Sequence, residues 1–315
     1  MKVVFMGTPD FAVGALEAIM DAGHEVTAVV TQPDKPKGRG KEMQVSPVKA
    51  CALEHGIEVF QPVKIKTPDA VDTLRTYEAD IFVVAAFGQI LSKEILDMPK
   101  YGCVNIHASL LPKYRGAAPI QWAVIDGEEE TGVTIQQMNE GVDTGDILMQ
   151  EVVKLDAKET GASLFDKLAV CGAQLIVKTL VEIEKGSLTP VKQDDSKSTH
   201  AKMLKKDMGN LDFSQEAVVL ERKIRGLNSW PSAYTYFKGK TLKIWDADVV
   251  EQNAKDIKPV GECGSVCEVA KDSFCIVTGK GCLRVKEVQL EGKKRMEVSA
   301  FLLGYPIETG MVFPN

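Results

Sequence analysis

Residues 81–86 read Ile-Phe-Val-Val-Ala-Ala, an uninterrupted apolar run with the length and composition of a strand that is buried on both faces. A strand of this kind needs a layer of helices on each side, which is the arrangement found in parallel sheets. The neighbouring sequence agrees, because short β-rich runs alternate with stretches of helical spacing through the first half of the chain. We therefore predict an α/β domain built on a doubly wound, mainly parallel sheet.

The same alternation gives the order of elements in this domain. Strands are expected at residues 3–6, 25–31, 57–60, 81–86, 104–107, 133–138 and 147–153, and helices at 11–22, 69–77, 117–125 and 162–185. Ligands of doubly wound sheets bind beyond the carboxyl ends of the strands. Gly7, Phe87, Gly88, Asn105 and His107 all end or follow predicted strands, so we expect a functional site at that edge of the sheet.

The second half of the chain differs in kind. With 315 residues the chain is long enough for two domains. Residues 187–198 are rich in Pro, Lys, Asp and Ser and lack periodicity, which predicts a linker over 187–206 after a first domain at 1–186. A helix at 214–226 is then followed by short alternating runs separated by turn residues. This spacing indicates a small β-barrel domain over 207–315.

The composition excludes several classes of protein. The hydrophobic content of 44% and charged content of 26% are those of an ordinary globular protein. The formal net charge of −6 argues against a protein that coats nucleic acid through an excess of Lys and Arg. No apolar run approaches the ~20 residues of a membrane span, and the N-terminus lacks the apolar core of a signal peptide. We therefore expect a cytoplasmic protein with no membrane partner.

Neither a metal nor a nicotinamide cofactor is expected. Seven cysteines, an odd number spread along the chain, fit reduced thiols in a cytosolic enzyme. Cys263, Cys267, Cys275 and Cys282 cluster, but they lack a Cys-x-x-Cys pair, and two of them lie in apolar, strand-like runs. We predict buried structural thiols there. The turn at Gly7 lacks the Gly-x-Gly-x-x-Gly spacing of a dinucleotide-binding loop.

The chemistry is concentrated in residues 105–119, which read Asn-Ile-His-Ala-Ser-Leu-Leu-Pro-Lys-Tyr-Arg-Gly-Ala-Ala-Pro. Asn105 and His107 lie two apart, so on a strand both side chains project from one face. An uncharged donor beside an imidazole that titrates near neutral pH suits a carbonyl that becomes an oxyanion during attack by an amine. The alternative is a strand end whose Asn and His satisfy loop backbone groups, and the two residues alone leave both interpretations open.

The residues that follow give the pair a context. Ser109-Leu110-Leu111-Pro112 comes directly after it, and Asp143 appears later in Gly141-Val142-Asp143-Thr144-Gly145-Asp146. This ordered set resembles the folate-dependent formyltransferases, which transfer a formyl group from 10-formyltetrahydrofolate to an amine.

The resemblance implies roles for these residues. Asn105 and His107 would hydrogen-bond the oxyanion of the tetrahedral intermediate, while Asp143 would orient His107 or relay the proton that leaves the amine. Arg115 stays open between a role at the site and a structural pairing. The folate would be bordered by Phe87, Gly88, Ile90, Leu91, Ser109, Leu110, Leu111 and Pro112.

A basic loop interrupts the α/β alternation at residues 32–41, Gln-Pro-Asp-Lys-Pro-Lys-Gly-Arg-Gly-Lys. Taken alone, such a loop is most simply a solvated connection. It resembles, however, the insertion with which formyltransferases that act on initiator methionyl-tRNA approach the acceptor end. The resemblance continues through residues 228–231 and 292–296 of a C-terminal barrel of OB type. It implies tRNA contacts by Lys35, Lys37, Arg39 and Lys41. Because barrels that bind oligonucleotides are common, candidate contacts to the tRNA backbone are Lys240, Lys243, Lys293, Lys294 and Arg295.

The amine acceptor is the open question. Formylation of initiator methionyl-tRNA for translation initiation is preferred, because a small amine such as a glycinamide nucleotide or an amino sugar requires neither the basic loop nor the barrel. A tRNA-binding protein with a degenerate transferase domain is disfavoured because Asn105, His107 and Asp143 are intact. A formyltetrahydrofolate hydrolase gives no reason for the basic loop. We expect the protein to be a monomer.

Overall fold

The computed structural model describes residues 1–37, 42–251 and 261–314. By their internal contacts the residues divide into two compact units. The first unit contains Met1–Pro119, Glu130–Lys154 and Phe165–Ala201, and the second contains Ile120–Glu129, Leu155–Leu164 and Lys202–Asn315. This division differs from continuous boundaries at residues 186 and 207, because a segment belongs to the unit against which it packs, wherever it lies in the sequence.

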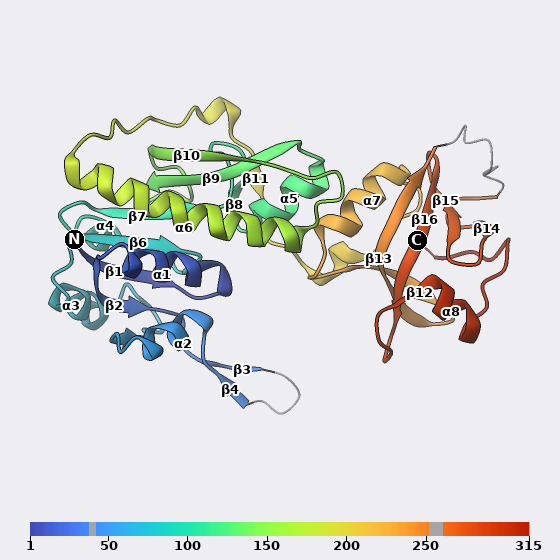
Figure 1. The fold of residues 1–315 in the computed structure, drawn as a ribbon, viewed down its shortest axis with the longest axis horizontal. Helices are drawn as coiled ribbons and strands as arrows, with labels where there is room; N and C mark the ends of the chain where they lie inside the picture. The colour runs from blue at the N-terminus through green and yellow to red at the C-terminus, as the bar shows by residue number, and fades with distance from the viewer. Residues whose placement is uncertain (38–41, 252–260, 315) are drawn as a thin grey trace. The chain divides into compact units, whose positions relative to one another are not determined.

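The first unit is built on a seven-stranded sheet in the order β10-β9-β7-β6-β1-β2-β5 (Figure 1). Its strands are β1 (Lys2–Gly7), β2 (Glu25–Val30), β5 (Val59–Phe60), β6 (Ile81–Ala85), β7 (Cys103–His107), β9 (Glu130–Gln137) and β10 (Ile147–Lys154). The strands from β7 to β5 pair in parallel, whereas β9 and β10 run antiparallel. The predicted mainly parallel sheet is confirmed, and every residue of β6 is buried, as its apolar run indicated.

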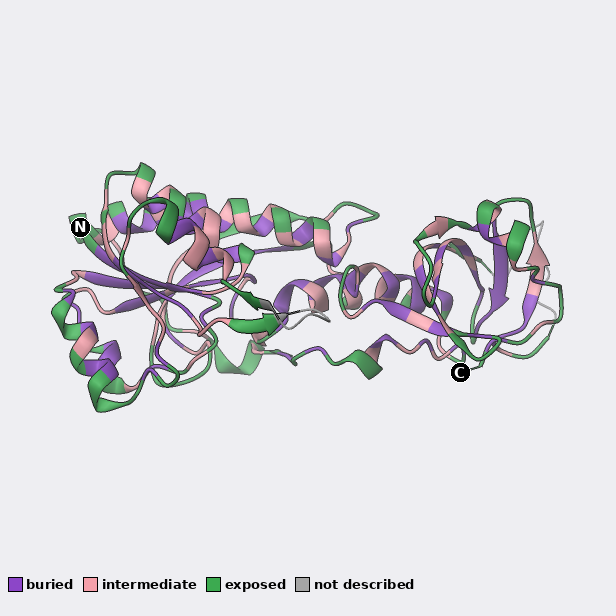
Figure 2. Cartoon of the chain, turned by 90° about the horizontal axis from the view of Figure 1, so that it is seen from below, coloured by how far each residue is buried: buried purple, intermediate pink, exposed green. Residues whose placement is uncertain are grey.

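Helices cover both faces of this sheet. On one face, α1 (Val13–Asp21) lies beside α6 (Gly161–Lys185), since a Cβ at Gly14 would be 4.0 Å from Ala173 of α6. On the other face, α3 (Pro68–Thr76) and α4 (Lys93–Leu96) pack on the sheet through a buried cluster that includes Val71, Leu74, Ile95, Leu96, Val4 and Phe82. Figure 2 shows the strands as the most buried layer of this unit. Within the described residues, no helix is both long enough and apolar enough to cross a membrane.

Some short elements were not predicted. Helix α2 (Pro47–Glu54) begins at Ser46, whose hydroxyl accepts from the Lys49 amide, and Pro47 occupies its first turn. This is a readable start signal, but the helix has no strong apolar periodicity to draw attention to it. The basic loop contains an antiparallel hairpin of β3 (Lys35–Lys37) and β4 (Glu42–Gln44). Residues 115–116 and 200–201 form a two-stranded parallel sheet, β8 (Arg115–Gly116) with β11 (His200–Ala201).

The second unit is an antiparallel sheet in the order β12-β13-β16-β15-β14, with β17 paired to β16. Its elements are α5 (Pro119–Asp126), α7 (Ala217–Gly226), β12 (Ala233–Phe237), β13 (Lys240–Val250), β14 (Val266–Val269), β15 (Phe274–Val277), β16 (Cys282–Leu290), β17 (Met296–Glu297) and α8 (Val298–Gly304). Five phenylalanines form much of its core: Phe213, Phe237, Phe274, Phe301 and Phe313.

The C-terminal residues connect the two ends of this sheet. Val266 of β14 donates its amide to the Met311 carbonyl at 2.8 Å, and Phe313 donates to Gly264 at 2.9 Å. Thr235 of β12 reaches the Pro314 carbonyl through its hydroxyl at 3.1 Å. Register shifts around Asp246 also bend β13. The sheet therefore curls around its core, in agreement with the predicted small β-domain.

Candidate active site

The predicted catalytic pair lies on β7, on the face opposite to α6. A Cβ placed on Gly172 of α6 would meet Ile106 at 2.9 Å and Val133 at 3.7 Å, so Ile106 points toward that helix. Because side chains alternate along a strand, Asn105 and His107 point to the other face. Both lie at the carboxyl end of the strand, where the parallel sheet is expected to present a site.

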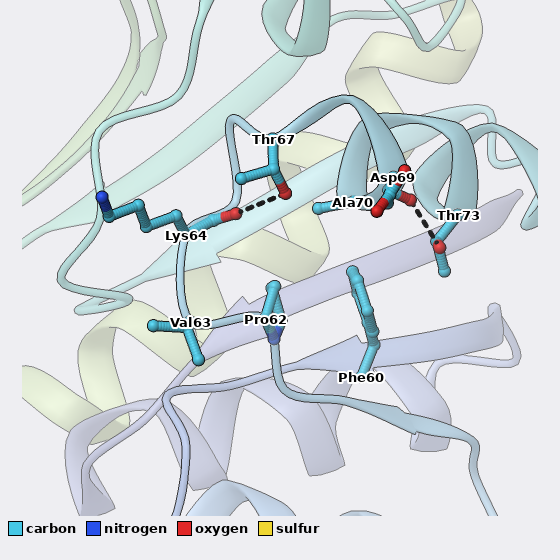
Figure 3. A pocket seen from close by; sticks show the side chains of 8 residues that line it. All are labelled: Phe60, Pro62, Val63, Lys64, Thr67, Asp69, Ala70 and Thr73. Atoms are coloured by element: carbon cyan, nitrogen blue, oxygen red, sulfur yellow. Dashed lines mark hydrogen bonds between the residues drawn. The ribbon is translucent and has the colours of Figure 1, made fainter.

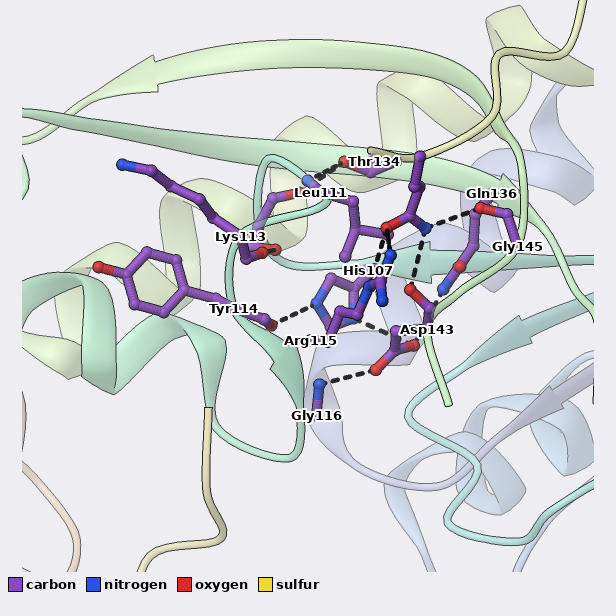
Figure 4. Close-up of polar contacts among 12 residues, drawn as sticks. His107, Leu111, Lys113, Tyr114, Arg115, Gly116, Thr134, Gln136, Asp143 and Gly145 are labelled. Carbon is purple, nitrogen blue, oxygen red and sulfur yellow. Dashed lines mark hydrogen bonds and ion pairs between the residues drawn. The ribbon is translucent and has the colours of Figure 1, made fainter. Parts of the chain in front are cut away.

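Both ring nitrogens of His107 face partners within the protein. Its side chain is buried, and Nε2 lies 2.9 Å from the Tyr114 carbonyl oxygen (Figure 4). Because a carbonyl can only accept, Nε2 carries a hydrogen in this arrangement. Nδ1 lies 3.5 Å from Oδ1 of Asp143. The ring therefore connects a loop carbonyl on one side with a carboxylate on the other, and Nδ1 and Oδ1 can share a further proton.

Asp143 is held by donors on both carboxylate oxygens. Oδ2 accepts from the Gly116 amide at 2.8 Å, and Oδ1 accepts from Nε2 of Gln136 at 2.9 Å. Its backbone has a φ of +53°, a left-handed conformation that Asp tolerates better than most residues. Asp143 and His107 are 36 positions apart in the sequence, and the structure brings their side chains into contact.

Asn105 differs from its neighbours because its side chain is half-buried and makes no hydrogen bond within the described part of the chain. The residue lies between Val84 of β6 and Gln136 of β9 in the sheet register. Its amide is thus held on a rigid strand with its donors and acceptor available. A preorganised amide of this kind can stabilise a developing oxyanion.

The Ser-Leu-Leu-Pro turn is fixed by buried polar contacts. The Thr134 hydroxyl donates to the Ser109 carbonyl at 2.6 Å and accepts from the Leu111 amide at 3.1 Å. The Ser109 hydroxyl donates to the Lys113 carbonyl at 2.7 Å. Ser109 and Leu111 are buried, whereas Leu110 and Pro112 are half-buried. Only Leu110 and Pro112 therefore have surface with which to touch a ligand.

The loop after β6 shows a similar division. Phe87 and Leu91 belong to the apolar cluster under α3 and α4, so their side chains support the loop from below. Gly88 is exposed, and Ile90 keeps 61% of its surface exposed. Gln89 anchors the loop, because its Oε1 accepts from the Ile65 amide at 2.8 Å and its Nε2 donates to the Pro62 carbonyl at 3.1 Å.

A pocket of about 330 Å³ lies between β5 and α3 (Figure 3). It is lined by Phe60, Pro62, Val63, Lys64, Thr67, Asp69, Ala70 and Thr73. None of these is a predicted site residue. Pro62 of the lining accepts from Gln89 of the loop after β6, whereas His107 and Asp143 are not among the lining residues. The chemistry is expected at the pair, because a buried imidazole in contact with a carboxylate is suited to proton transfer.

The basic hairpin is anchored at its base. Nζ of Lys49 lies 2.5 Å from Oδ2 of Asp34 and 2.7 Å from Oε1 of Gln61. The hydrogen bonds from Lys49 and Gln61 lower the pKa of the Asp34 carboxyl below its ordinary value. Lys35 is exposed, and Lys37 lies within β3. Arg39 and Lys41, which were also predicted to contact tRNA, lie outside the described residues.

Two of the basic residues predicted on the barrel are already engaged. Arg295 forms an ion pair with Glu287, and its guanidinium carbon lies 4.9 Å from the ring centre of Trp245. The Lys243 ammonium lies 5.5 Å from the same ring. These contacts within the protein account for the positions of the Arg295 and Lys243 side chains without a bound tRNA. Lys240, Lys293 and Lys294 are exposed.

The cysteine cluster consists of separate thiols. Cys275 and Cys282 are buried on β15 and β16, and burial raises the pKa of each to about 12. Sγ of Cys267 lies 3.7 Å from Sγ of Cys282, while Cys275 donates to Glu268 at 3.4 Å. Across the ranges that the structure describes, no group of three or more His, Cys, Asp or Glu residues could hold a metal ion.

The sequence did not identify two glutamines of the site. Gln136 is 2% exposed and donates to Asp143, while its own Oε1 is buried without a partner among the described residues. Gln136 follows the apolar residues of β9, and a polar side chain at the end of a buried strand was the sequence signal that could have identified it. Gln193 accepts from Arg115 and donates to the carbonyls of Asp143 and Gly145. Arg115 thus has the structural pairing that the sequence left open.

Comparisons with known proteins cover nearly the whole chain. A family model described as formyl transferase matches residues 1–180, and a second, described as formyl transferase C-terminal domain, matches residues 203–306. A methionyl-tRNA formyltransferase of Lachnospira eligens is 61% identical over 316 residues, covering 99% of each chain. One from Agathobacter rectalis is 58% identical, also over 99% of each chain.

A solved structure shares the fold at lower identity. An N-formyltransferase of Helicobacter canadensis, in complex with folinic acid and dTDP-3-aminofucose, has a TM-score of 0.65 and 19% sequence identity. It covers 94% of this chain and 100% of its own length.

Proposed function

We infer the function of this chain from the family to which it belongs, the formyl transferases. The chain is a formyl-transferring enzyme, and the acceptor that its full-length relatives indicate is methionyl-tRNA. The observation that carries this assignment is 61% identity over 99% of both chains, because it extends through both structural units. The small-amine alternative is not favoured.

We propose that the formyl donor is 10-formyltetrahydrofolate. The proposal is supported by the folinic acid bound in the related N-formyltransferase and by the surface at the carboxyl ends of β6 and β7. There the exposed backbone around Gly88 and the apolar side chain of Ile90 offer polar and apolar contacts to a flat ring system. Leu110 and Pro112 would add apolar contact, with Phe87, Leu91, Ser109 and Leu111 fixing the wall behind them.

In the proposed reaction the methionine α-amino group attacks the formyl carbon. A carbon–nitrogen bond forms, and the tetrahedral intermediate carries its negative charge on the former carbonyl oxygen. The free amide of Asn105 donates to that oxygen, as His107 also can when its ring releases the Tyr114 carbonyl. The bond from the formyl carbon to N10 of the folate then breaks.

The proton from the amine passes through the His107 and Asp143 pair to N10 of the departing folate. The 3.5 Å contact between Nδ1 and Oδ1 gives this proton a place to reside. The products are formylmethionyl-tRNA and tetrahydrofolate, and no covalent enzyme intermediate is needed.

The proposed tRNA contacts are Lys35, Lys37, Arg39 and Lys41 of the basic segment 32–41, with the exposed lysines of the second unit as further phosphate contacts. We place the enzyme in the cytoplasm with its tRNA substrate and expect it to act as a monomer. Sedimentation at assay concentration tests the latter.

The decisive experiment measures transfer of labelled formyl from 10-formyltetrahydrofolate to charged initiator tRNA, with a glycinamide nucleotide and a dTDP-amino sugar as competing acceptors. The expected result is formylation of the tRNA alone. Asn105→Ala should lower kcat about 100-fold, the cost of removing one oxyanion donor, without changing the melting temperature. Preference for either small amine would overturn the assignment of the acceptor.

A further inference from the structure

Residues 191–201 form a strap across the first unit. Figure 1 follows the chain from the end of α6 back along the sheet to β11. At one end, the amides and carbonyls of Val191 and Ile147 exchange hydrogen bonds at 2.8 and 2.9 Å. At the other end, His200 and Ala201 pair with Arg115 and Gly116. The strap lies between the two family matches, which end at residue 180 and resume at residue 203.

One residue in the middle of the strap turns inward. Residues 192 and 194–197 are exposed, whereas Gln193 is half-buried. Its Nε2 donates to the carbonyl of Asp143 at 2.9 Å and to that of Gly145 at 2.7 Å. Its Oε1 accepts from Nε of Arg115 at 3.0 Å and from Nη2 at 2.8 Å.

These four bonds use the whole hydrogen-bonding capacity of the amide, which has two donors and two acceptor sites. The orientation of the amide is fixed as well. A flipped group would place its oxygen against two carbonyls and its nitrogen against a guanidinium that can only donate.

The two segments that Gln193 joins both determine where the Asp143 carboxylate lies. On one side, Gln193 holds the backbone of the turn in which Asp143 has its left-handed conformation. On the other, it holds Arg115, whose side chain is only 11% exposed and whose next residue, Gly116, donates to Oδ2 of Asp143. A shift on either side changes the distance between Asp143 and Nδ1 of His107.

We propose that Gln193 is a positioning residue for formyl transfer. It does not touch the reacting atoms. It sets the placement of Asp143 against His107 by joining the Asp143 turn to the Arg115-Gly116 segment through one amide. This inference rests on the proposed roles of His107 and Asp143.

The test uses two variants of similar size in the full-length enzyme. Gln193→Glu keeps an acceptor for Arg115, now charged, but offers no donor to the carbonyls of Asp143 and Gly145. Gln193→Met loses both functions. Arg115 also pairs with Asp195 at 2.7 Å, a contact that both variants keep. Because Glu adds a second acceptor for the buried guanidinium and Met does not, the Glu variant should have the higher melting temperature. Because Glu places a negative charge against two carbonyls, its kcat should be no higher than that of the Met variant.

We expect kcat to fall about 10-fold in Gln193→Met and about 100-fold in Gln193→Glu, with both KM values changed by less than about 2-fold, which indicates loss in the transition state alone. The matched control is Lys192→Met, an exposed neighbour, which should behave as wild type. If Gln193 acted on folding alone, the variant with the higher melting temperature would also have the higher kcat. The expected opposite order in Gln193→Glu and Gln193→Met therefore separates positioning from folding.

Two results would overturn the proposal: kcat values that follow the melting temperatures, or a Gln193→Glu enzyme that keeps more than half of the wild-type kcat. The second criterion still decides if Gln193→Met fails to fold. Failure of the proposed function is recognised separately, because the wild-type enzyme would then not formylate methionyl-tRNA in the same assay.

Discussion

The basic hairpin of β3 and β4 and the strap at residues 191–201 are both polar segments without helical or strand periodicity, yet they are held in different ways. The hairpin bonds along its own length, strand to strand, and its base is fixed by an ion pair between Lys49 and Asp34. The strap bonds to other parts of the first unit, through backbone pairs at its ends and the neutral amide of Gln193 between them.

The difference shows that one polar segment can serve to contact a partner while another serves to position the rest of the unit. A segment that satisfies its own backbone can project its side chains outward, which suits contact with a large partner. A segment that satisfies the backbone of others holds them in place. The comparison predicts that changes in the strap lower kcat, whereas changes at the hairpin base weaken the contact with tRNA.

The largest expected effect is that of Gly116→Ala, beside the strap. Gly116 has a φ of +113°, and an added Cβ would lie 2.8 Å from the Ala201 carbonyl oxygen. The strap and the amide that donates to Asp143 must then separate. We expect kcat to fall about 100-fold and the free energy of unfolding to fall by about 3 kcal/mol.

The matched control for this prediction is Gly186→Ala. Gly186 has a φ of +66°, but an added Cβ would meet nothing within 4 Å. Strain alone should cost about 1 kcal/mol and leave kcat unchanged. Equal losses in the two variants, measured by chemical denaturation and by formylation kinetics, would refute the close contact between Gly116 and the strap.

A smaller effect is expected for Arg115→Lys. A lysine keeps the charge but cannot place two donors on Oε1 of Gln193, so the strap loses its planar pairing. We expect kcat, measured with methionyl-tRNA and 10-formyltetrahydrofolate both saturating, to fall about 10-fold. Lys197→Ala removes only an exposed ion pair with Asp194 and should change kcat by less than about 2-fold. A wild-type kcat in Arg115→Lys would show that the pairing is not needed for turnover.

The hairpin base should respond differently. Asp34→Asn removes the charged partner of Lys49 and leaves its bond to Gln61, so the hairpin is less firmly held. We expect kcat/KM for methionyl-tRNA to fall about 3-fold, an effect of weakened contact, with the KM for 10-formyltetrahydrofolate unchanged. Asp72→Asn, on the exposed side of α3, is the matched control. A loss that appears equally in the folate KM would mean that the hairpin base also shapes the folate site.

The smallest effect is the response of the hairpin base to acid. Hydrogen bonds from Lys49 and Gln61 lower the Asp34 pKa, so the pair stabilises the folded base above the ordinary Asp value of about 3.9 and is lost as pH falls through the lowered value. Hydrogen exchange at about pH 5 and about pH 3 should show amides of β3 and β4 losing protection at the lower pH. Amides of β8 and β11 should open only with the whole unit, and simultaneous opening of both pairs would contradict the comparison.

Much of this arrangement could be read from the sequence. The apolar run of β6 indicated the buried strand, and strand alternation placed Asn105 and His107 on one face. The approach of Asp143 to His107 follows from the pairing of β7 with β9, which no local pattern specifies. The sequence resemblance supplied that residue.

Gln193 was beyond the reach of sequence reasoning. Its partners lie 50 positions away at Asp143 and 78 positions away at Arg115, and its neighbours are Lys and Asp, as in a solvated linker. The amino-acid composition of a segment predicts whether the segment as a whole is exposed to water. It does not predict which single side chain is buried. The linker over residues 187–206 stays a prediction, while by their contacts residues 191–201 belong to the first unit.

The strap also limits how this protein can be divided and recombined. A chimaera that joins the first unit to another acceptor-binding module at residue 180 or 186 would leave the Asp143 turn without its amide clamp, although every residue named in the reaction would be present. A junction after Ala201 would keep the clamp. Exchange of modules in evolution or in the laboratory should therefore preserve activity only when the strap travels with the catalytic sheet.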